Sequence, residues 1–173
     1  MYYARAVDQN MIPSLGSIAA QQANPTEQSI QKVEQLLDYA GTHPDTVITY
    51  QVSVMLLAGH KDNSYLSETK SRSREGGHFL MSNIIGFPPN NGKVLKIAKI
   101  IKAVMSSAAE DELGSLFINC KEAIPARQSL EEMGHKQPPT TMQTDNTTES
   151  GVVTNNISSK RLKSMDTILH WLQ

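Results

Sequence analysis

The first fifty residues alternate apolar and polar positions at a spacing that predicts two helices. Apolar side chains recur at helical spacing through residues 10–22, and again through residues 30–40 after a start signal at 24–26. Gly41 is expected to end the second helix, because glycine commonly follows the last helical turn. The β-branched and aromatic run at residues 46–50 favours a strand.

After residue 51 the pattern changes to short apolar runs divided by turns, and helical periodicity returns only later. A loop is predicted where prolines, asparagines and a glycine gather at 88–92. Ser107 and Glu110 form a capping box, which predicts a helix start. The expected strands are 52–59, 76–81 and 140–145, and the expected helices are 107–124, 125–134 (opened by Pro125 and ended by Gly134), 147–156 and a last one capped by Ser158 or Ser159. This succession predicts an α/β fold with one central sheet.

Residues 93–105 fit two different structures. Lysines recur every third residue, at positions 93, 96, 99 and 102, with apolar pairs between them, which is the period of an amphipathic helix. Valine and isoleucine are so frequent between the lysines that the same stretch also has the composition of a strand. The pattern by itself leaves both alternatives open.

The composition excludes several classes of protein. The 173 residues include 39% hydrophobic and 19% charged side chains, unlike a collagenous or a highly charged disordered chain. No apolar run is long enough to cross a membrane, and the first ten residues lack the pattern of a secretory signal. The single Cys120 excludes an intrachain disulfide and a multi-cysteine zinc site. We therefore expect no membrane partner.

Charge is unevenly distributed along the chain. The 16 basic and 17 acidic residues give a net charge of −1, which argues against an obvious nucleic-acid binder. Residues 1–50 hold two basic and five acidic groups, whereas residues 60–105 hold eight basic and three acidic groups. A basic excess of this kind is usually a solvated face, but it is also compatible with binding phosphates.

Four carboxylates lie at the edges of predicted packing faces. Asp62 and Asp145 end predicted strands, and Glu112 and Asp166 border the apolar stripes of predicted helices. For any one of them, a helix cap or a salt bridge is the more common explanation. If all four converge, their mutual repulsion requires cations, and hard oxygen ligands suit Mg²⁺ or Mn²⁺. Two such ions about 4 Å apart can hydrolyse a phosphodiester.

Several motifs in collinear order cover nearly the whole chain. The most specific is Ser106-Ser107-Ala108-Ala109-Glu110-Asp111-Glu112, followed by Thr144-Asp145-Asn146. The others are Tyr2-Tyr3-Ala4-Arg5-Ala6-Val7-Asp8, Gln22-Ala23-Asn24-Pro25-Thr26, Leu36-Leu37-Asp38-Tyr39, His60-Lys61-Asp62-Asn63-Ser64-Tyr65-Leu66, and Met165-Asp166 with His170. At these residues the chain resembles the carboxy-terminal part of a copia-type retrotransposon polyprotein, namely the ribonuclease H domain behind its reverse transcriptase.

The resemblance implies a ribonuclease H-like fold, in which helices flank a mixed sheet of five strands. Residues 52–173 would form this domain, and residues 1–51 would be a short helical remnant of the polymerase thumb and connection. The third strand would lie near Val94–Ile101, which decides the ambiguity of residues 93–105 in favour of a strand. No Tyr-x-Asp-Asp polymerase motif occurs in the chain. The remainder of a reverse transcriptase polyprotein is therefore an expected partner, and the implied location is intracellular, in a cytoplasmic particle or the nucleus.

The implied activity is hydrolysis of the RNA strand of RNA–DNA hybrids with two Mg²⁺ or Mn²⁺ ions. The resemblance assigns the catalytic and metal-binding carboxylates to Asp62, Glu112 (with Glu110 as the alternative), Asp145 and Asp166. Asn63 stands where family members usually have a small residue. The expected substrate contacts are Asn63, Ser64, Lys70, Arg72, Arg74, Asn146, Lys160 and Arg161.

Two other functions compete with this one. A catalytically inactive retroelement remnant would keep the fold or the hybrid binding without turnover, as the missing polymerase motif suggests. An integrase-like nuclease on a similar fold is the weaker alternative, because that group uses fewer acids with other spacing.

Overall fold

The computed structural model describes residues 2–68, 70–86, 88–102 and 105–145. The chain divides into two compact units, Met1–Tyr50 and Gln51–Gln173, one residue before the division expected from the sequence. The helices predicted for residues 147–156 and after Ser158 lie outside the described residues.

The first unit consists of helices. They are α1 (Tyr2–Ala6), the 3-10 helix η1 (Gln9–Met11), α2 (Ile12–Ala20) and α3 (Glu27–Thr42). Thr26 caps α3: its hydroxyl accepts a hydrogen bond from the amide of Ser29 at 3.3 Å, and the Ser29 hydroxyl accepts one from the Thr26 amide at 3.1 Å. The two predicted helices are therefore confirmed.

The predicted end of α3 at Gly41 is wrong, because the helix continues through Thr42. The Thr42 hydroxyl donates to the carbonyl oxygen of Asp38 at 2.8 Å, and the His43 amide donates to the carbonyl oxygen of Tyr39 at 2.9 Å. These bonds satisfy carbonyl groups of the last turn, so the helix ends without using the glycine.

The predicted strand at residues 46–50 is also wrong, and the strand predicted from Val52 starts later. Residues 46–55 have no regular structure. In this stretch the amide of Gln51 donates to the side chain of Asn91 at 2.8 Å, and that of Val54 donates to the side chain of Asn83 at 2.7 Å. Met55 has a φ of 64°. A left-handed residue interrupts an extended chain, so the strand begins only after Met55.

The second unit is built on a four-stranded sheet in the order β3-β2-β1-β4. The strands are β1 (Leu56–Glu68), β2 (Arg72–Ser82), β3 (Lys93–Ile100) and β4 (Thr141–Gln143). β2 pairs antiparallel with both β1 and β3, whereas β4 pairs parallel with β1. The protein is therefore an α/β protein with one central sheet, as the sequence pattern predicted, and the sheet is mixed, as the resemblance implied. A fifth strand does not occur among the residues that the structure describes.

The ambiguous stretch at 93–105 is a strand in its described first part. Seven residue pairs align β3 with β2, and Ile97 is buried. Pairing with β2 therefore overrides the helical period of the lysines. The strand predicted at residues 76–81 and the loop at 88–92 are confirmed where they are described.

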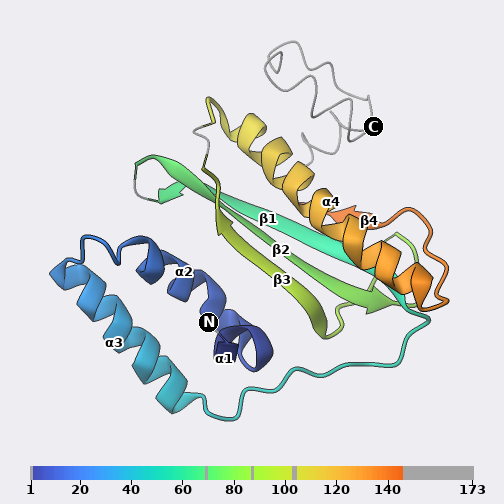
Figure 1. Ribbon diagram of the computed structural model, residues 1–173, viewed down its shortest axis with the longest axis horizontal. Helices are drawn as coiled ribbons and strands as arrows, with labels where there is room; N and C mark the ends of the chain where they lie inside the picture. Colours follow the sequence, from blue (N-terminus) through green and yellow to red (C-terminus); the bar gives the residue numbers. More distant parts are fainter. Residues whose placement is uncertain (1, 69, 87, 103–104, 146–173) are drawn as a thin grey trace. The chain divides into compact units, whose positions relative to one another are not determined.

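One long helix, α4 (Ala108–Glu132), crosses one face of the sheet (Figure 1). Its predicted start is confirmed, because the Ser107 hydroxyl accepts the amide of Glu110 at 3.2 Å. The predicted start of a second helix at Pro125 is wrong. Pro125 is exposed inside α4, and the buried Ala123 and Leu130 hold the helix against the sheet on either side of it.

The end of α4 at Gly134 is confirmed by its geometry. Gly134 has a φ of +91°, its amide donates to the carbonyl oxygen of Glu131 at 3.0 Å, and the amide of His135 donates to that of Leu130 at 2.9 Å. This pair of bonds is the Schellman motif, in which glycine adopts the left-handed conformation without a steric cost.

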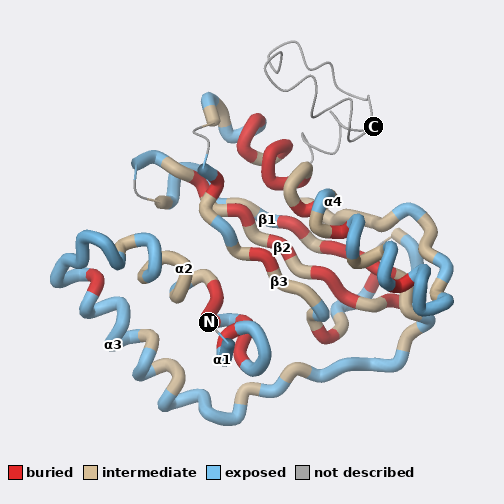
Figure 2. Tube along the Cα trace, viewed as in Figure 1, coloured by how far each residue is buried: buried red, intermediate tan, exposed pale blue. Residues whose placement is uncertain are grey.

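The core of the second unit lies between α4 and the sheet. Leu57, Phe79, Ile97, Ala123 and Leu130 form one buried cluster, and buried positions gather on the strands and along α4 (Figure 2). No helix in the described ranges is long and apolar enough to cross a bilayer.

Candidate functional site

Two side chains of β1 bind the first turns of α4 and form a polar contact that we call the β1–α4 seam, made by Lys61, Asn63, Asp111 and Glu112. The Lys61 Nζ contacts the Glu112 Oε2 and donates to the Glu112 carbonyl oxygen at 3.2 Å. The Asn63 side-chain amide donates to the Asp111 Oδ2. The side chain of Lys61 is 0% exposed and that of Glu112 is 18% exposed. The seam is therefore largely withdrawn from water.

Asp62 lies on the other side of the same strand. Successive side chains of a strand point to opposite faces, so Asp62 points away from the face on which Lys61 and Asn63 meet α4. Asp62 is exposed, and its Oδ1 accepts the amide of Asn63 at 2.8 Å. The plane of β1 separates Asp62 from Glu112.

The prediction that Asp62 ends its strand is wrong. β1 continues to Glu68, because β2 pairs with it as far as Ser64 opposite Arg74 and again at Glu68 opposite Arg72. Hydrogen bonding to β2 extends the strand through a polar segment that has no apolar alternation of its own.

Of the two glutamates proposed for the helix, Glu110 has a structural role. Its Oε2 accepts the amide of Ser106 at 3.0 Å and contacts the Ser106 hydroxyl. The second half of the predicted capping box is thus made with Ser106 instead of Ser107. Glu112 is left as the helix carboxylate of the site, and it is paired with Lys61.

The expected metal centre is not assembled by the residues that the structure describes. Asp145 is exposed and follows β4 by two residues, and Asp166 lies outside the described residues. Within the described ranges, no group of three or more His, Cys, Asp or Glu side chains is arranged to hold a metal ion. Asp62, Glu112 and Asp145 therefore do not converge on one site.

The predicted substrate contacts fall into three groups. Lys70, Ser64 and Arg72 lie in the β1–β2 hairpin, where Lys70 is exposed. Arg74 is bound within the hairpin, with its Nε donating to Glu68 at 2.7 Å and its side chain 12% exposed, and the Asn63 side-chain amide is directed at α4. Asn146, Lys160 and Arg161 lie outside the described residues.

Two buried carboxylates were not singled out from the sequence: Asp111, which belongs to the seam, and Glu75, which lies opposite Asn63 on β2. Asp111 is 0% exposed and Glu75 is 1% exposed. The pKa of Glu75 is raised to about 7, mainly by burial. Lys99 opposes this shift, and Glu122 adds to it. Glu75 is two residues before Gly77 and four before Phe79, so alternation along β2 places it on the core face. This alternation is the sequence signal that could have identified Glu75 as buried.

Asn119 completes the buried polar side of α4. Its side-chain amide donates to the Ser115 carbonyl oxygen at 2.9 Å and to the Gly76 carbonyl oxygen at 3.4 Å. A Cβ at Gly77 would lie 1.8 Å from the Asn119 Oδ1. Only glycine at position 77 allows α4 to place this amide against β2.

The face of the sheet that carries Asp62 also carries a histidine pair. His60 and His78 are directly opposite each other on β1 and β2, and their rings stack with centroids 5.0 Å apart. Burial and then Lys93 lower the pKa of His78 to about 4, and burial lowers the pKa of His60. Both rings are therefore neutral at pH 7 and add no charge beside Asp62.

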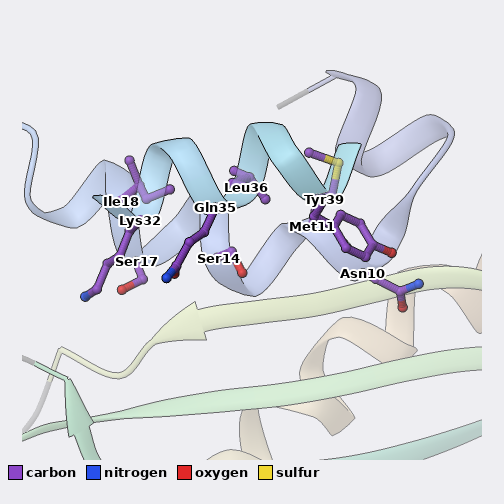
Figure 3. A pocket seen from close by; sticks show the side chains of 9 residues that line it. All are labelled: Asn10, Met11, Ser14, Ser17, Ile18, Lys32, Gln35, Leu36 and Tyr39. Atoms are coloured by element: carbon purple, nitrogen blue, oxygen red, sulfur yellow. The ribbon is translucent and has the colours of Figure 1, made fainter. Parts of the chain in front are cut away.

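The first unit has a pocket of its own between α2 and α3, with a volume of about 420 Å³. Polar side chains line much of it, including Ser14, Ser17, Lys32, Gln35 and Tyr39 (Figure 3). None of the predicted site residues lines this pocket.

Comparison with protein-family models, curated proteins and solved structures finds no match for this chain.

Proposed function

We propose that residues 51–173 form a ribonuclease H-like domain of a copia-type retroelement and that this domain binds RNA–DNA hybrids. The observation that carries the proposal is the order and direction of the elements: an antiparallel β1-β2-β3 sheet, then α4, then β4 parallel to β1. Asp62 on β1, Glu112 on α4 and Asp145 just after β4 occupy the elements that the resemblance assigns to the first three acids.

The charge of the sheet supports a nucleic-acid partner. Residues 60–105, which cover most of β1 and all of β2 and β3, include eight basic and three acidic residues. Lysine and arginine bind phosphates through electrostatic contacts that position a duplex without reading its sequence. Lys70 is the exposed basic residue at the tip of the β1–β2 hairpin and is the phosphate contact that we propose first.

Hydrolysis of the RNA strand is the second candidate, and the presence of all four acids in collinear order favours it. It requires two divalent ions, which supply an activated water and stabilise the leaving oxygen. The described residues do not fit such a centre, because Asp62 and Glu112 lie on opposite sides of β1 and Glu112 is paired with Lys61. Binding without turnover is therefore the function that the geometry supports better. The remainder of a reverse transcriptase polyprotein is the proposed protein partner.

Fluorescence anisotropy of a labelled RNA–DNA hybrid tests the proposal on the full chain. We expect saturable binding that weakens with salt, because each neutralised phosphate releases counterions. Lys70→Glu should weaken binding and lower the salt dependence by about one ion. Lys121→Glu changes an exposed lysine on α4 and is the matched control. No hybrid binding, or equal losses in the two variants, would contradict the proposal.

Cleavage of the same hybrid decides between the two candidate functions. With Mg²⁺ or Mn²⁺ present, we expect neither the wild-type chain nor Asp62→Asn to cleave it. Cleavage by the wild type that is lost in Asp62→Asn would establish the nuclease and refute binding without turnover.

A further inference from the structure

Lys61 places a buried positive charge against the helix that the ribonuclease H assignment would use for metal binding. Its side chain is 0% exposed, and its Nζ reaches both the carboxylate and the carbonyl oxygen of Glu112. An ammonium group withdrawn from water is stable only when it is paired and hydrogen-bonded. Glu112 supplies two of these contacts from α4.

A divalent cation and the Lys61 ammonium would compete for the same carboxylate. A metal ion bound at Glu112 would lie next to a positive charge, and the two would repel each other. Binding the metal would therefore require the ammonium to leave, which would separate a buried charge from its counter-charge. Water cannot solvate the ammonium in place of Glu112, because the lysine side chain is fully buried, so the separation would cost free energy.

The neighbouring pair holds the seam in the same arrangement. Asn63 binds the Asp111 carboxylate from the next inward-facing position of β1. Two consecutive contacts, one charged and one polar, thus attach β1 to the first turns of α4. The contact between Asn63 and Asp111 therefore restrains any movement of Lys61 away from Glu112.

We infer that Lys61 takes, at Glu112, the place that a divalent cation would occupy, so that Glu112 is not a metal ligand in this chain. The inference rests on the proposed ribonuclease H-like domain, because that assignment is what makes Glu112 a candidate ligand. Lys61 is then a built-in counter-ion that stabilises β1 against α4.

Titration of the full chain with Mn²⁺ tests the inference without nucleic acid. Binding is measured as the loss of the electron paramagnetic resonance signal of free Mn²⁺. Glu112→Gln should bind Mn²⁺ within about twofold of the wild type. Lys61→Met should bind Mn²⁺ at least about tenfold more tightly, because a positive charge beside Glu112 is removed. A tenfold change in affinity corresponds to about 1.4 kcal/mol of binding free energy. The double variant Lys61→Met/Glu112→Gln should lose that gain.

Lys99 provides a matched control, because it pairs with Glu122 of α4 at 2.6 Å but is 57% exposed. Lys99→Met should leave Mn²⁺ affinity unchanged, since water screens that pair. Lys61→Gln serves if Lys61→Met does not fold, as judged by circular dichroism, and the comparison of Glu112→Gln with the wild type needs neither lysine variant.

Three results would overturn the inference: a tenfold loss of Mn²⁺ affinity in Glu112→Gln, no gain on removing Lys61, or an equal gain in Lys99→Met. Its failure is distinguishable from that of the proposed function. A chain that does not bind hybrids refutes the function but leaves the Mn²⁺ comparison interpretable, and the reverse also holds.

Discussion

Charged residues in the second unit owe their roles to the neighbours that the fold supplies. Lys61 and Asp62 are adjacent in sequence, yet one is buried against α4 and the other is exposed. Arg74, expected to contact phosphate, is bound to Glu68 within its own hairpin. Strand alternation decides these outcomes, because each step of one residue moves a side chain to the other face.

Glu75 should make the stability of the protein depend on pH. Its pKa in the fold is about 7, above the ordinary value of 4.5, so the folded state holds the proton more tightly than the unfolded chain. Stability from this group is complete below pH 4.5 and is lost as the pH rises through 7. Urea unfolding should therefore show Glu75→Gln more stable than the wild type at pH 8, by on the order of 3 kcal/mol, and similar to it near pH 4.5.

Glu132→Gln is the control for this measurement, because Glu132 is exposed at the end of α4. Its effect on the free energy of unfolding should be small and the same at both pH values. An equal stabilisation by Glu75→Gln at both pH values would show that shape or packing, rather than protonation, is responsible.

At the scale of elements, β1 and α4 are both longer than their local sequences indicate. β1 runs through polar residues to Glu68 because β2 pairs with it. α4 includes Pro125 because its buried residues pack on the sheet before and after the proline. In both cases a long-range contact outweighs a local preference worth only a few kcal/mol.

Gly77 is the point where the packing of α4 on β2 is most easily disrupted. A Cβ there would lie 1.8 Å from the Asn119 side chain. We expect Gly77→Ala to lower the free energy of unfolding by about 1–3 kcal/mol, measured by urea titration and followed by circular dichroism.

Gly41→Ala is the opposite case, because nothing lies within 4 Å of a Cβ added at that helical position of α3. Alanine should be neutral or stabilise α3 by about 0.5–1 kcal/mol. If both alanine variants have the same effect, the contact between Gly77 and Asn119 is not what matters.

At the scale of the whole molecule, the chain consists of two compact units joined by a segment without regular structure. Residues 46–55 include Val47, Tyr50, Val52 and Val54, all exposed, with Val52 at 96%. Exposed apolar side chains on irregular backbone are accessible to proteases.

Limited digestion with chymotrypsin should therefore cut after Tyr50 before any other site among residues 2–68, 70–86, 88–102 and 105–145. Mass spectrometry of early time points would identify a fragment that ends at Tyr50. An earlier cut after Phe79, which is fully buried, would contradict the division into two units.

Local patterns predicted much of the secondary structure. Helix starts at Thr26 and Ser107 were recognisable because capping depends on residues three positions apart. Local composition indicates the strand at 76–81, whereas the strand near Val94–Ile101 follows only from the family resemblance, because the local pattern also fits a helix. The strand predicted at 46–50 and the separate helix predicted from Pro125 are wrong. The local sequence does not show that residues 46–50 have no regular structure or that α4 packs on the sheet on both sides of Pro125.

Local sequence patterns indicated most of the helices and strands of the described residues and the α/β class with one central sheet, and they singled out Asp62, Glu112 and Asp145. These follow from spacing, capping and composition, which act over a few residues. Three features emerge only once the chain is folded: Asp62 and Glu112 lie on opposite sides of β1, Lys61 pairs with Glu112, and Glu75 is buried. Those outcomes depend on the register of β1 against β2 and on the way α4 crosses them, and such contacts join residues up to about fifty positions apart.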